Sequence, residues 1–212
     1  MNQKINQFVA ELVGLHSGDG TLYLTNRSIV WELRGSLEEK EFYQKYLKSL
    51  LYKIFKTNFE PKFRSGGKNG CFGFQITKKE VVYKLLNCGF NVGRKSNTLR
   101  IPSYIFEEDD EIKRAYIRGL FDTDGCFRFE MINKKPYPKI EFCSASLELI
   151  NDLNFLLKHL GFRTYIWGKK YYKLGIAGHL QINKFLFEIR PSNTKHLKRV
   201  EHFRLVLSAA VA

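Results

Sequence analysis

The sequence predicts an α+β protein built as a tandem αββαββα duplication, with two antiparallel sheets forming a saddle and two motif helices packed at the central interface. The first observation is a nine-residue pattern that occurs twice, as LVGLHSGDG at 12–20 and IRGLFDTDG at 117–125. Its two Asp-Gly ends lie 105 positions apart (124 − 19). The second observation is that apolar residues at helical spacing precede each copy, and that a strand-like alternation of apolar and polar residues follows it. The third is a local match between the halves, as between SLLYKIF at 49–55 and FLLKHLG at 155–161.

These repeats predict an N-terminal half over residues 1–100 and a C-terminal half over residues 101–212, joined by a short link near 100–103. A chain of 212 residues can bury a sizeable core, as one domain or as two closely packed halves. Its hydrophobic content of 44% and aromatic content of 15% exclude a disordered chain.

In the first half, the pattern predicts two β-hairpins with a helix between them. Residues 21–26 and 29–35 form the first hairpin, with Leu22 and Leu24 on its inner face. Ser36 and Glu39 have the spacing of a capping box, so a helix begins there, and its apolar stripe continues to Ile54. The remaining expected elements are strands at 58–65 and 71–77 and a helix from 79 to about 87, which Gly89 stops.

The second half repeats this order. The acidic run at 107–111 opens the motif helix, where it offsets the positive end of the helix dipole. Ser146 caps the helix that follows the first hairpin. The expected elements are strands at 127–132 and 139–144 around a turn at 134–138, a helix to Leu160, strands at 163–168 and 171–178, and helices near 180–189 and 194–210.

Each motif helix ends in one carboxylate, Asp19 or Asp124. A lone Asp-Gly at a helix end is ordinary turn chemistry, and the negative C-terminal end of a helix disfavours Asp. Its repetition at matching positions points instead to a shared site, because two close carboxylates repel unless a cation lies between them. Oxygen ligands alone favour Mg²⁺. Small residues on one face of each helix would let the two backbones meet, and these are Gly14, Gly18, Gly119 and Thr123.

The two segments resemble the two motifs of the LAGLIDADG homing endonucleases, in the single-chain form that carries both motifs. In that family the last acid of each motif is a metal ligand, so the resemblance implies that Asp19 and Asp124 hold the catalytic metal, with the carbonyls of Gly18 and Thr123 assisting. The first motif departs from the pattern at Ser17, where an acid is often found, and at His16, where an apolar residue is usual. We expect His16 to be packed rather than catalytic.

Two late segments, RKSNTLR at 94–100 and PSNTKHLK at 191–198, share Ser-Asn-Thr. A lysine in this part of each half approaches the cleavage site in the family. The resemblance therefore implies catalytic roles for Lys95 and Lys195. The alternative is a capping Asn or Thr beside a lysine that only binds phosphate.

The net charge of +14 favours a polyanionic partner. The apolar face of each sheet must pack against the helices, which leaves the opposite face exposed to solvent and basic. A β-ribbon of this kind fits the major groove of DNA. Alternating Lys and Arg can also serve only to keep a strand face soluble. The side chains expected to contact DNA are Tyr23, Arg27, Arg34, Lys62, Arg64, Lys68, Gln75, Arg128, Lys134, Lys135, Lys139, Arg163, Lys169, Lys170, Tyr171 and Lys173.

The resemblance implies a site-specific endonuclease that makes a Mg²⁺-dependent staggered break, with 3′ overhangs, in a long and roughly palindromic double-stranded DNA target. One alternative is an intron maturase that binds host intron RNA on the same fold. Another is a DNA-binding regulator that has lost catalysis, which the intact pair of motif acids argues against. An intein is disfavoured because the chain starts at Met1 and ends in SAAVA.

Two motifs in one chain imply a monomer. Four cysteines without a CxxC pair, no signal-peptide core and no long apolar run lead us to expect an intracellular, soluble protein with reduced thiols.

Overall fold

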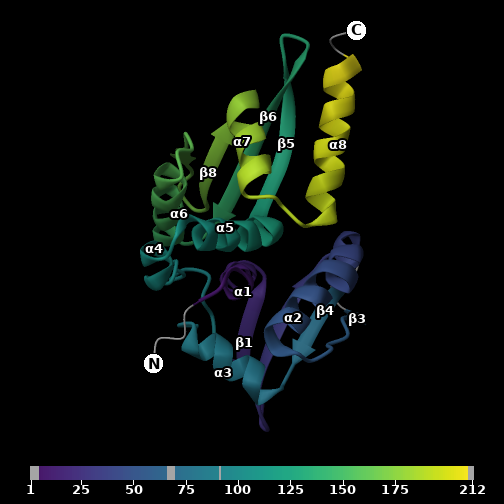
Figure 1. Ribbon diagram of the computed structural model, residues 1–212, viewed down its shortest axis with the longest axis vertical. Helices are drawn as coiled ribbons and strands as arrows, with labels where there is room; N and C mark the ends of the chain where they lie inside the picture. The colour runs from purple at the N-terminus through teal and green to yellow at the C-terminus, as the bar shows by residue number, and fades with distance from the viewer. Residues whose placement is uncertain (1–4, 66–69, 91, 210–212) are drawn as a thin grey trace.

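The computed structural model describes residues 5–65, 70–90 and 92–209. In it, four antiparallel strands form each of two sheets, in the orders β1-β2-β4-β3 and β5-β6-β8-β7. The two halves follow one another along the long axis of the molecule, and helices α1 and α5 meet between them (Figure 1). The predicted α+β class, the repeated antiparallel sheet and the central helix pair are confirmed.

The helices and strands of each half follow the predicted order, except that the short helix α4 precedes the motif helix of the second half and was not predicted. The first half contains α1 (Gln7–Ser17), β1 (Gly20–Leu24), β2 (Ile29–Gly35), the 3-10 turn η1 (Leu37–Glu39), the π-helical segment η2 (Phe42–Leu47), α2 (Lys48–Phe55), β3 (Lys62–Arg64), β4 (Cys71–Ile76) and α3 (Lys79–Asn87). The second half contains α4 (Tyr104–Glu107), α5 (Asp110–Asp124), β5 (Gly125–Ile132), β6 (Lys135–Ser144), α6 (Leu147–His159), β7 (Tyr165–Trp167), β8 (Tyr172–Ala177), α7 (His179–Glu188) and α8 (Thr194–Ala209).

Side-chain caps fix the helix starts. The carboxylate of Asp109 accepts the N–H of Ile112 at 3.0 Å, so the acidic run does open α5 as predicted. The hydroxyl of Ser146 accepts the N–H of Leu149 at 3.2 Å and starts α6. In the first half, the backbone N–H of Ser36 donates to Glu39 at 2.8 Å, which is the predicted capping box.

The helix expected from residue 37 to 54 is confirmed, and its hydrogen bonding changes along its length from 3-10 in η1 through π-helical in η2 to α-helical in α2. Three details of the sequence-based prediction are wrong. The strand expected over 58–65 is reduced to β3, and Leu24 is 69% exposed at the end of β1 instead of lying on the inner face.

The turn expected at 134–138 is the two-residue turn Asn133-Lys134, whose φ angles are +49° and +62°. The residues after it belong to β6. Pro136 and Pro138 are tolerated there because this part of β6 pairs with β5 alone, and pairing with β8 begins at Lys139.

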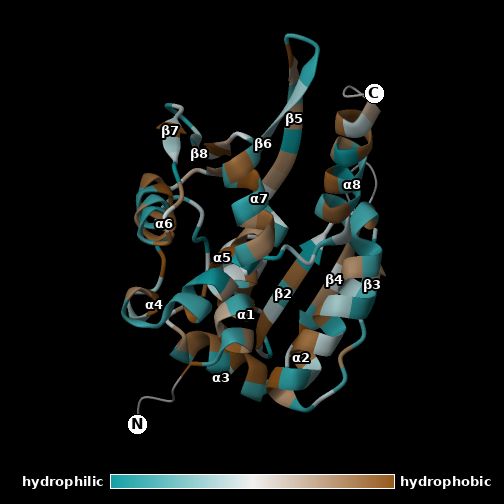
Figure 2. Ribbon diagram, turned by 45° about the horizontal axis from the view of Figure 1, so that its top comes forward, coloured by the Kyte–Doolittle hydropathy of each residue, from teal (hydrophilic) through white to brown (hydrophobic). Residues whose placement is uncertain are grey.

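The core lies between the helices and the inner face of each sheet. In the second half, the ring of Phe121 on α5 packs 5.1 Å from Phe185 on α7 and 5.5 Å from Phe142 on β6, measured between centroids. Helix α8 packs along the same sheet, with Phe203 at 5.7 Å from Phe127. Figure 2 shows α8 alternating between hydrophobic and hydrophilic residues, as a helix with one buried face does. Among the described helices, none is long and apolar enough to cross a membrane.

Candidate active site

Helices α1 and α5 cross with their backbones in contact at two glycines. A Cβ added at Gly14 would collide with the carbonyl oxygen of Tyr116 and lie 2.9 Å from the backbone N of Leu120. A Cβ added at Gly119 would collide in the same way with the carbonyl oxygen of Glu11. Positions 11 and 116 are related by the same 105-residue spacing as the motifs. The two glycine contacts are therefore equivalent and are related by a local two-fold axis. Only glycine permits this approach at either place.

The same packing brings the two motif carboxylates together. A Cβ added at Gly18 would collide with the hydroxyl of Thr123 and lie 3.3 Å from the carboxyl carbon of Asp124. The carboxyl group of Asp124 therefore lies against the end of α1, next to Asp19. Both acids are partly buried at the ends of their helices.

The electrostatics of this pair suit a cation. Burial, followed by repulsion from Asp124 and Glu39, raises the pKa of Asp19 to about 7. Burial raises the pKa of Asp124 to about 6, although Lys95 and Lys195 act to lower it. In the described parts of the chain, no cluster of three or more His, Cys, Asp or Glu side chains could hold a metal. An ion at Asp19 and Asp124 would need backbone carbonyls and water as further ligands, which is acceptable for Mg²⁺.

Lys95 approaches the pair from the first half. Its Nζ donates to the carbonyl oxygens of Ser17 at 2.7 Å and of Gly18 at 2.8 Å. These are C-terminal carbonyls of α1, which carry partial negative charge and attract a cation. Burial lowers the pKa of Lys95, against the attraction of Asp124 and Asp19. The carbonyl of Gly18 thus already accepts a cationic group, as a metal-binding carbonyl would.

Lys195 approaches from the second half through different partners. Its Nζ donates to Oε1 of Glu39 at 2.9 Å, and Nδ2 of Asn193 donates to the same oxygen at 2.7 Å. Glu39 is 4% exposed and contributes to the repulsion that raises the pKa of Asp19. The sequence identified Glu39 only as a capping residue, and no feature of that local pattern signals its contact with the other half.

Asp122, the additional acid of the second motif, connects the motif helix to the segment before α8. Its fully buried carboxylate accepts the backbone N–H groups of Ser192 at 2.9 Å and Asn193 at 3.1 Å. Burial raises the pKa of Asp122 to about 8, against these two hydrogen bonds. The Ser-Asn-Thr segment that precedes Lys195 is thereby fixed to the end of α5.

Ser17 and His16, where the first motif departs from the family pattern, both form buried hydrogen bonds. Ser17 stands at the position equivalent to Asp122, and its Oγ donates to the carbonyl of Val13 at 3.0 Å and accepts the hydroxyl of Tyr116 at 3.1 Å. His16 is buried, and its Nδ1 accepts the indole N–H of Trp31 at 3.0 Å. Burial, with a contribution from Lys95, lowers the pKa of His16 to about 3, so its ring is neutral at pH 7.

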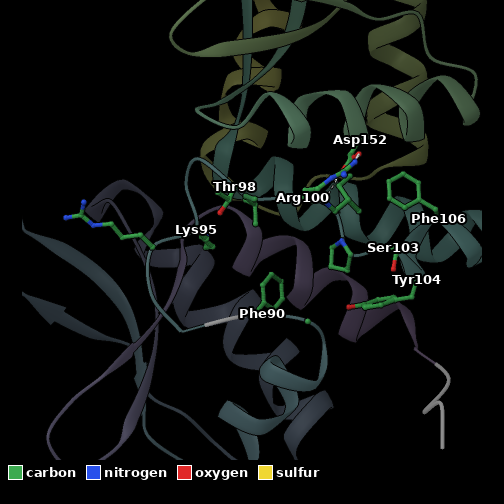
Figure 3. Close-up of a pocket in the computed structure, with 13 residues that line it drawn as sticks. Phe90, Lys95, Thr98, Arg100, Ser103, Tyr104, Phe106 and Asp152 are labelled. Atoms are coloured by element: carbon green, nitrogen blue, oxygen red, sulfur yellow. Dashed lines mark hydrogen bonds and ion pairs between the residues drawn. The ribbon is translucent and has the colours of Figure 1, made fainter.

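Beside the active site, the link between the halves borders a hollow of about 600 Å³ (Figure 3). Arg100 donates to both carboxylate oxygens of Asp152 on α6, at 2.8 and 3.1 Å. The backbone N–H of Ile101 donates to Asp152 as well, at 3.1 Å. Lys95 lines the same hollow and lies five residues before Arg100, so the segment that carries this lysine leads directly into a link that is attached to the second half.

The residues expected to contact DNA divide into two groups. On the first sheet, Gln75 donates to the hydroxyl of Tyr23 at 3.1 Å and accepts Arg34 at 3.4 Å, and Arg64 donates to Glu32 at 3.0 Å. On the second sheet, Arg128 and Lys139 both donate to Glu130. These polar side chains share one face of each sheet.

The other candidates lie at strand ends and loops. The exposed ones are Arg27, Lys62, Lys134, Lys135, Arg163, Lys169, Lys170 and Tyr171. Lys173 is partly buried, with its Nζ 5.9 Å from the ring centroid of Trp167. Lys68 lies outside the described residues.

The family model of the LAGLIDADG-like domain matches residues 111–190, which include the second motif. Among solved structures, a variant of the homing endonuclease I-DmoI has a TM-score of 0.60 and 18% identity, covering 86% of this chain and 94% of that one. The LAGLIDADG meganuclease I-AabMI, bound to uncleaved DNA, has a TM-score of 0.62 and 12% identity, covering 97% of this chain and 91% of that one. At these identities the likeness shows the fold.

Curated relatives match this chain over a small part of their own length. The ribonucleoside-diphosphate reductase NrdEB subunit alpha of Bacillus subtilis is 28% identical over 75% of this chain and 15% of the relative. The tRNA-splicing ligase RtcB of Methanopyrus kandleri is 26% identical over 85% of this chain and 20% of the relative. The chain thus spans only about a fifth or less of the length of these curated relatives. The domain match shows a LAGLIDADG-like domain over residues 111–190, and the architecture of the whole chain is the fold of the single-chain LAGLIDADG homing endonucleases.

Proposed function

We propose that this protein is a site-specific DNA endonuclease that cuts both strands of a long, roughly palindromic target. The observation that carries the proposal is the meeting of Asp19 and Asp124 at the ends of crossing helices, with one lysine from each half beside them. Solved structures of I-DmoI contain DNA with Mn or with Ca, and those of I-SmaMI contain uncleaved DNA with calcium ions. By likeness of fold, duplex DNA and a divalent cation are the proposed partners of this chain.

The two carboxylates, with the carbonyl oxygens of Gly18 and Thr123, are the proposed ligands of Mg²⁺. When bound, Mg²⁺ would supply the positive charge that activates a water molecule and stabilises the leaving oxygen of a phosphodiester. Lys95 and Lys195 would help to polarise the attacking water or the scissile phosphate, because each places an ammonium group next to the carboxylates from its own side.

One carboxylate from each half matches one cut per strand, and the resemblance to the LAGLIDADG homing endonucleases implies that the break is staggered with 3′ overhangs. Residues 1–100 and 101–212 would each bind one half of the target. The two half-sites differ because the two halves differ in sequence. We propose that a monomer suffices, since both motifs lie in one chain.

The test begins with selection of bound duplexes from a random DNA library by the full-length chain in EDTA. The selected duplex is then incubated with wild type and with Asp19→Asn, in Mg²⁺ and in EDTA. A double-strand cut that requires Mg²⁺ and is lost in the variant would support the proposal. Selective binding without any cut would indicate a DNA-binding regulator, and binding of structured RNA in place of duplex DNA would indicate a maturase.

A further inference from the structure

Two glutamates occupy equivalent places on the two sheets. Gly20 pairs with Leu33 in the first sheet and Gly125 pairs with Phe142 in the second, so Glu32 and Glu141 each directly precede the residue that pairs with the motif glycine. Their side chains are only 15% and 13% exposed. The duplication has therefore placed one carboxylate at the same position of each half, next to the end of a motif helix and on the face away from the core.

Each of these carboxylates holds an arginine. Both oxygens of Glu32 accept Nη1 of Arg64, at 3.0 and 3.4 Å, and Oε1 also accepts Nη2 of Arg34 at 3.5 Å. Glu141 accepts Nη2 of Arg128, whose Nη1 donates to Glu130 at 2.6 Å. The guanidinium groups are fixed relative to the sheet before any ligand arrives, so little side-chain freedom remains to be lost on binding.

An arginine held by a carboxylate is poorly suited to bind a phosphate, because the carboxylate repels the phosphate as well. The edges of bases are neutral and impose no such repulsion. In the major groove, guanine offers the acceptors O6 and N7 to an arginine, whereas cytosine N4 and adenine N6 offer amine donors to a carboxylate. A carboxylate accepts about four hydrogen bonds, so it can hold its arginine and still accept one from a base.

We propose that Glu32 and Glu141 determine sequence specificity, one in each half of the DNA target. Each accepts a hydrogen bond from the exocyclic amine of cytosine or adenine, while Arg64 or Arg128 donates to an acceptor edge beside it. The proposal rests on the DNA binding proposed above. It gives the target an amine-bearing base at two positions that are related by the pseudo-two-fold axis of the protein.

Selection from a random duplex library in EDTA, followed by sequencing, tests this with the full-length chain. Glutamine keeps the shape of glutamate but can donate as well as accept, so it no longer rejects a carbonyl-bearing base. Base contacts of this kind discriminate by about 5- to 100-fold. We expect Glu32→Gln to reduce the preference for an amine-bearing base by about fivefold or more at one position, and Glu141→Gln to do so in the opposite half-site.

Glu188→Gln is the matched control. Glu188 forms a comparable ion pair with Arg114 at 3.2 Å and is 22% exposed, but it joins α7 to α5 and lies on no strand. Its selected motif should equal that of wild type. Arg64→Gln is an independent second variant on a side chain that is 57% exposed, and it should alter the position next to the one that Glu32→Gln alters.

Unchanged motifs in both glutamate variants would overturn the inference. Equal weakening of all sequences would overturn it as well, because that result indicates a role in the fold or in phosphate binding. If wild type selects no motif and binds no duplex, the proposed function itself fails, and the inference fails with it.

Discussion

Replacing Asp19 by Asn should make the metal-free protein more stable at pH 8, whereas most substitutions of partly buried residues destabilise. Burial and repulsion from Asp124 raise the pKa of Asp19 from its ordinary value of 3.8 to about 7. Asparagine has nearly the same shape and carries no charge. The substitution therefore removes the cost of holding an ionised carboxylate at this place.

The magnitude follows from the difference in pKa between the folded and unfolded states. Because the folded pKa is the higher one, ionisation costs nothing below about pH 3.8, and its cost grows until the pH passes about 7. At about 1.4 kcal/mol per pKa unit, a shift of roughly three units costs about 4 kcal/mol at pH 8. Asp19 and Asp124 share their repulsion and titrate as a pair, so we expect a gain of about 2–4 kcal/mol. In a chain of this size that raises Tm by about 5–15 °C.

Thermal unfolding followed by circular dichroism, in EDTA at pH 5, 6, 7 and 8, measures this. The stability gain of Asp19→Asn should grow by about 2–3 kcal/mol from pH 5 to pH 8. Asp152→Asn is a control of opposite sign: the carboxylate of Asp152 accepts Arg100 and the N–H of Ile101, so its loss should lower Tm throughout. Added Mg²⁺ should stabilise wild type more than Asp19→Asn. The reasoning is refuted if Asp19→Asn brings no gain at pH 8, or an equal gain at pH 5.

Three further predictions concern the helix crossing and the DNA surface. Gly119→Ala should destabilise by about 1–3 kcal/mol in urea denaturation, because its Cβ would collide with the backbone of Glu11; a much smaller loss for Gly14→Ala would contradict the two-fold symmetry of the crossing. Arg118→Met should lower the free energy of unfolding by about 3–5 kcal/mol, because Arg118 donates at 2.6 Å to Glu11, whose side chain is 1% exposed. Adding Glu11→Gln to this variant should restore part of the lost stability in a double-mutant cycle. Raising salt from about 50 to about 200 mM should weaken DNA binding by about 10³-fold or more if six or more phosphates are contacted, and a flat salt dependence would exclude the basic faces as the contact surface.

Most of the fold is predictable from the sequence because its signals are local. Ser146 and Asp109 cap their helices through residues three positions away, and alternation of apolar residues defines the strands. The early start of β6 is not predictable in this way. Pro136 and Pro138 indicate a turn, and they are acceptable in a strand only because β8 does not reach that far along β6.

The site is predictable only where the repeated motif marks it. Asp19 and Asp124 are found from the duplication, whereas the partners of Glu39 are 154 and 156 positions away in the chain. Such a contact exists only after the halves pack, so no local pattern reveals it. The same holds for the sheet glutamates: a count of basic residues treats Arg64 and Arg128 as free cations, and strand pairing then places Glu32 and Glu141 beside them.

The two halves have become complementary rather than remaining copies. Across the helix crossing, Arg118 donates to Glu11 at 2.6 Å, and Arg118 stands where the first half has Val13. If the first half packed against a second copy of itself, Glu11 would meet Val13 and lose its cationic partner. The hydroxyl of Tyr46 would still donate to it at 2.7 Å, but the carboxylate would be buried without a counter-charge, at a cost of several kcal/mol. The second half has Tyr116 in place of Glu11, so pairing with its own copy would leave Arg118 without its acceptor. The interface therefore favours one N-terminal half with one C-terminal half, which supports the proposed monomer and a target whose two half-sites differ.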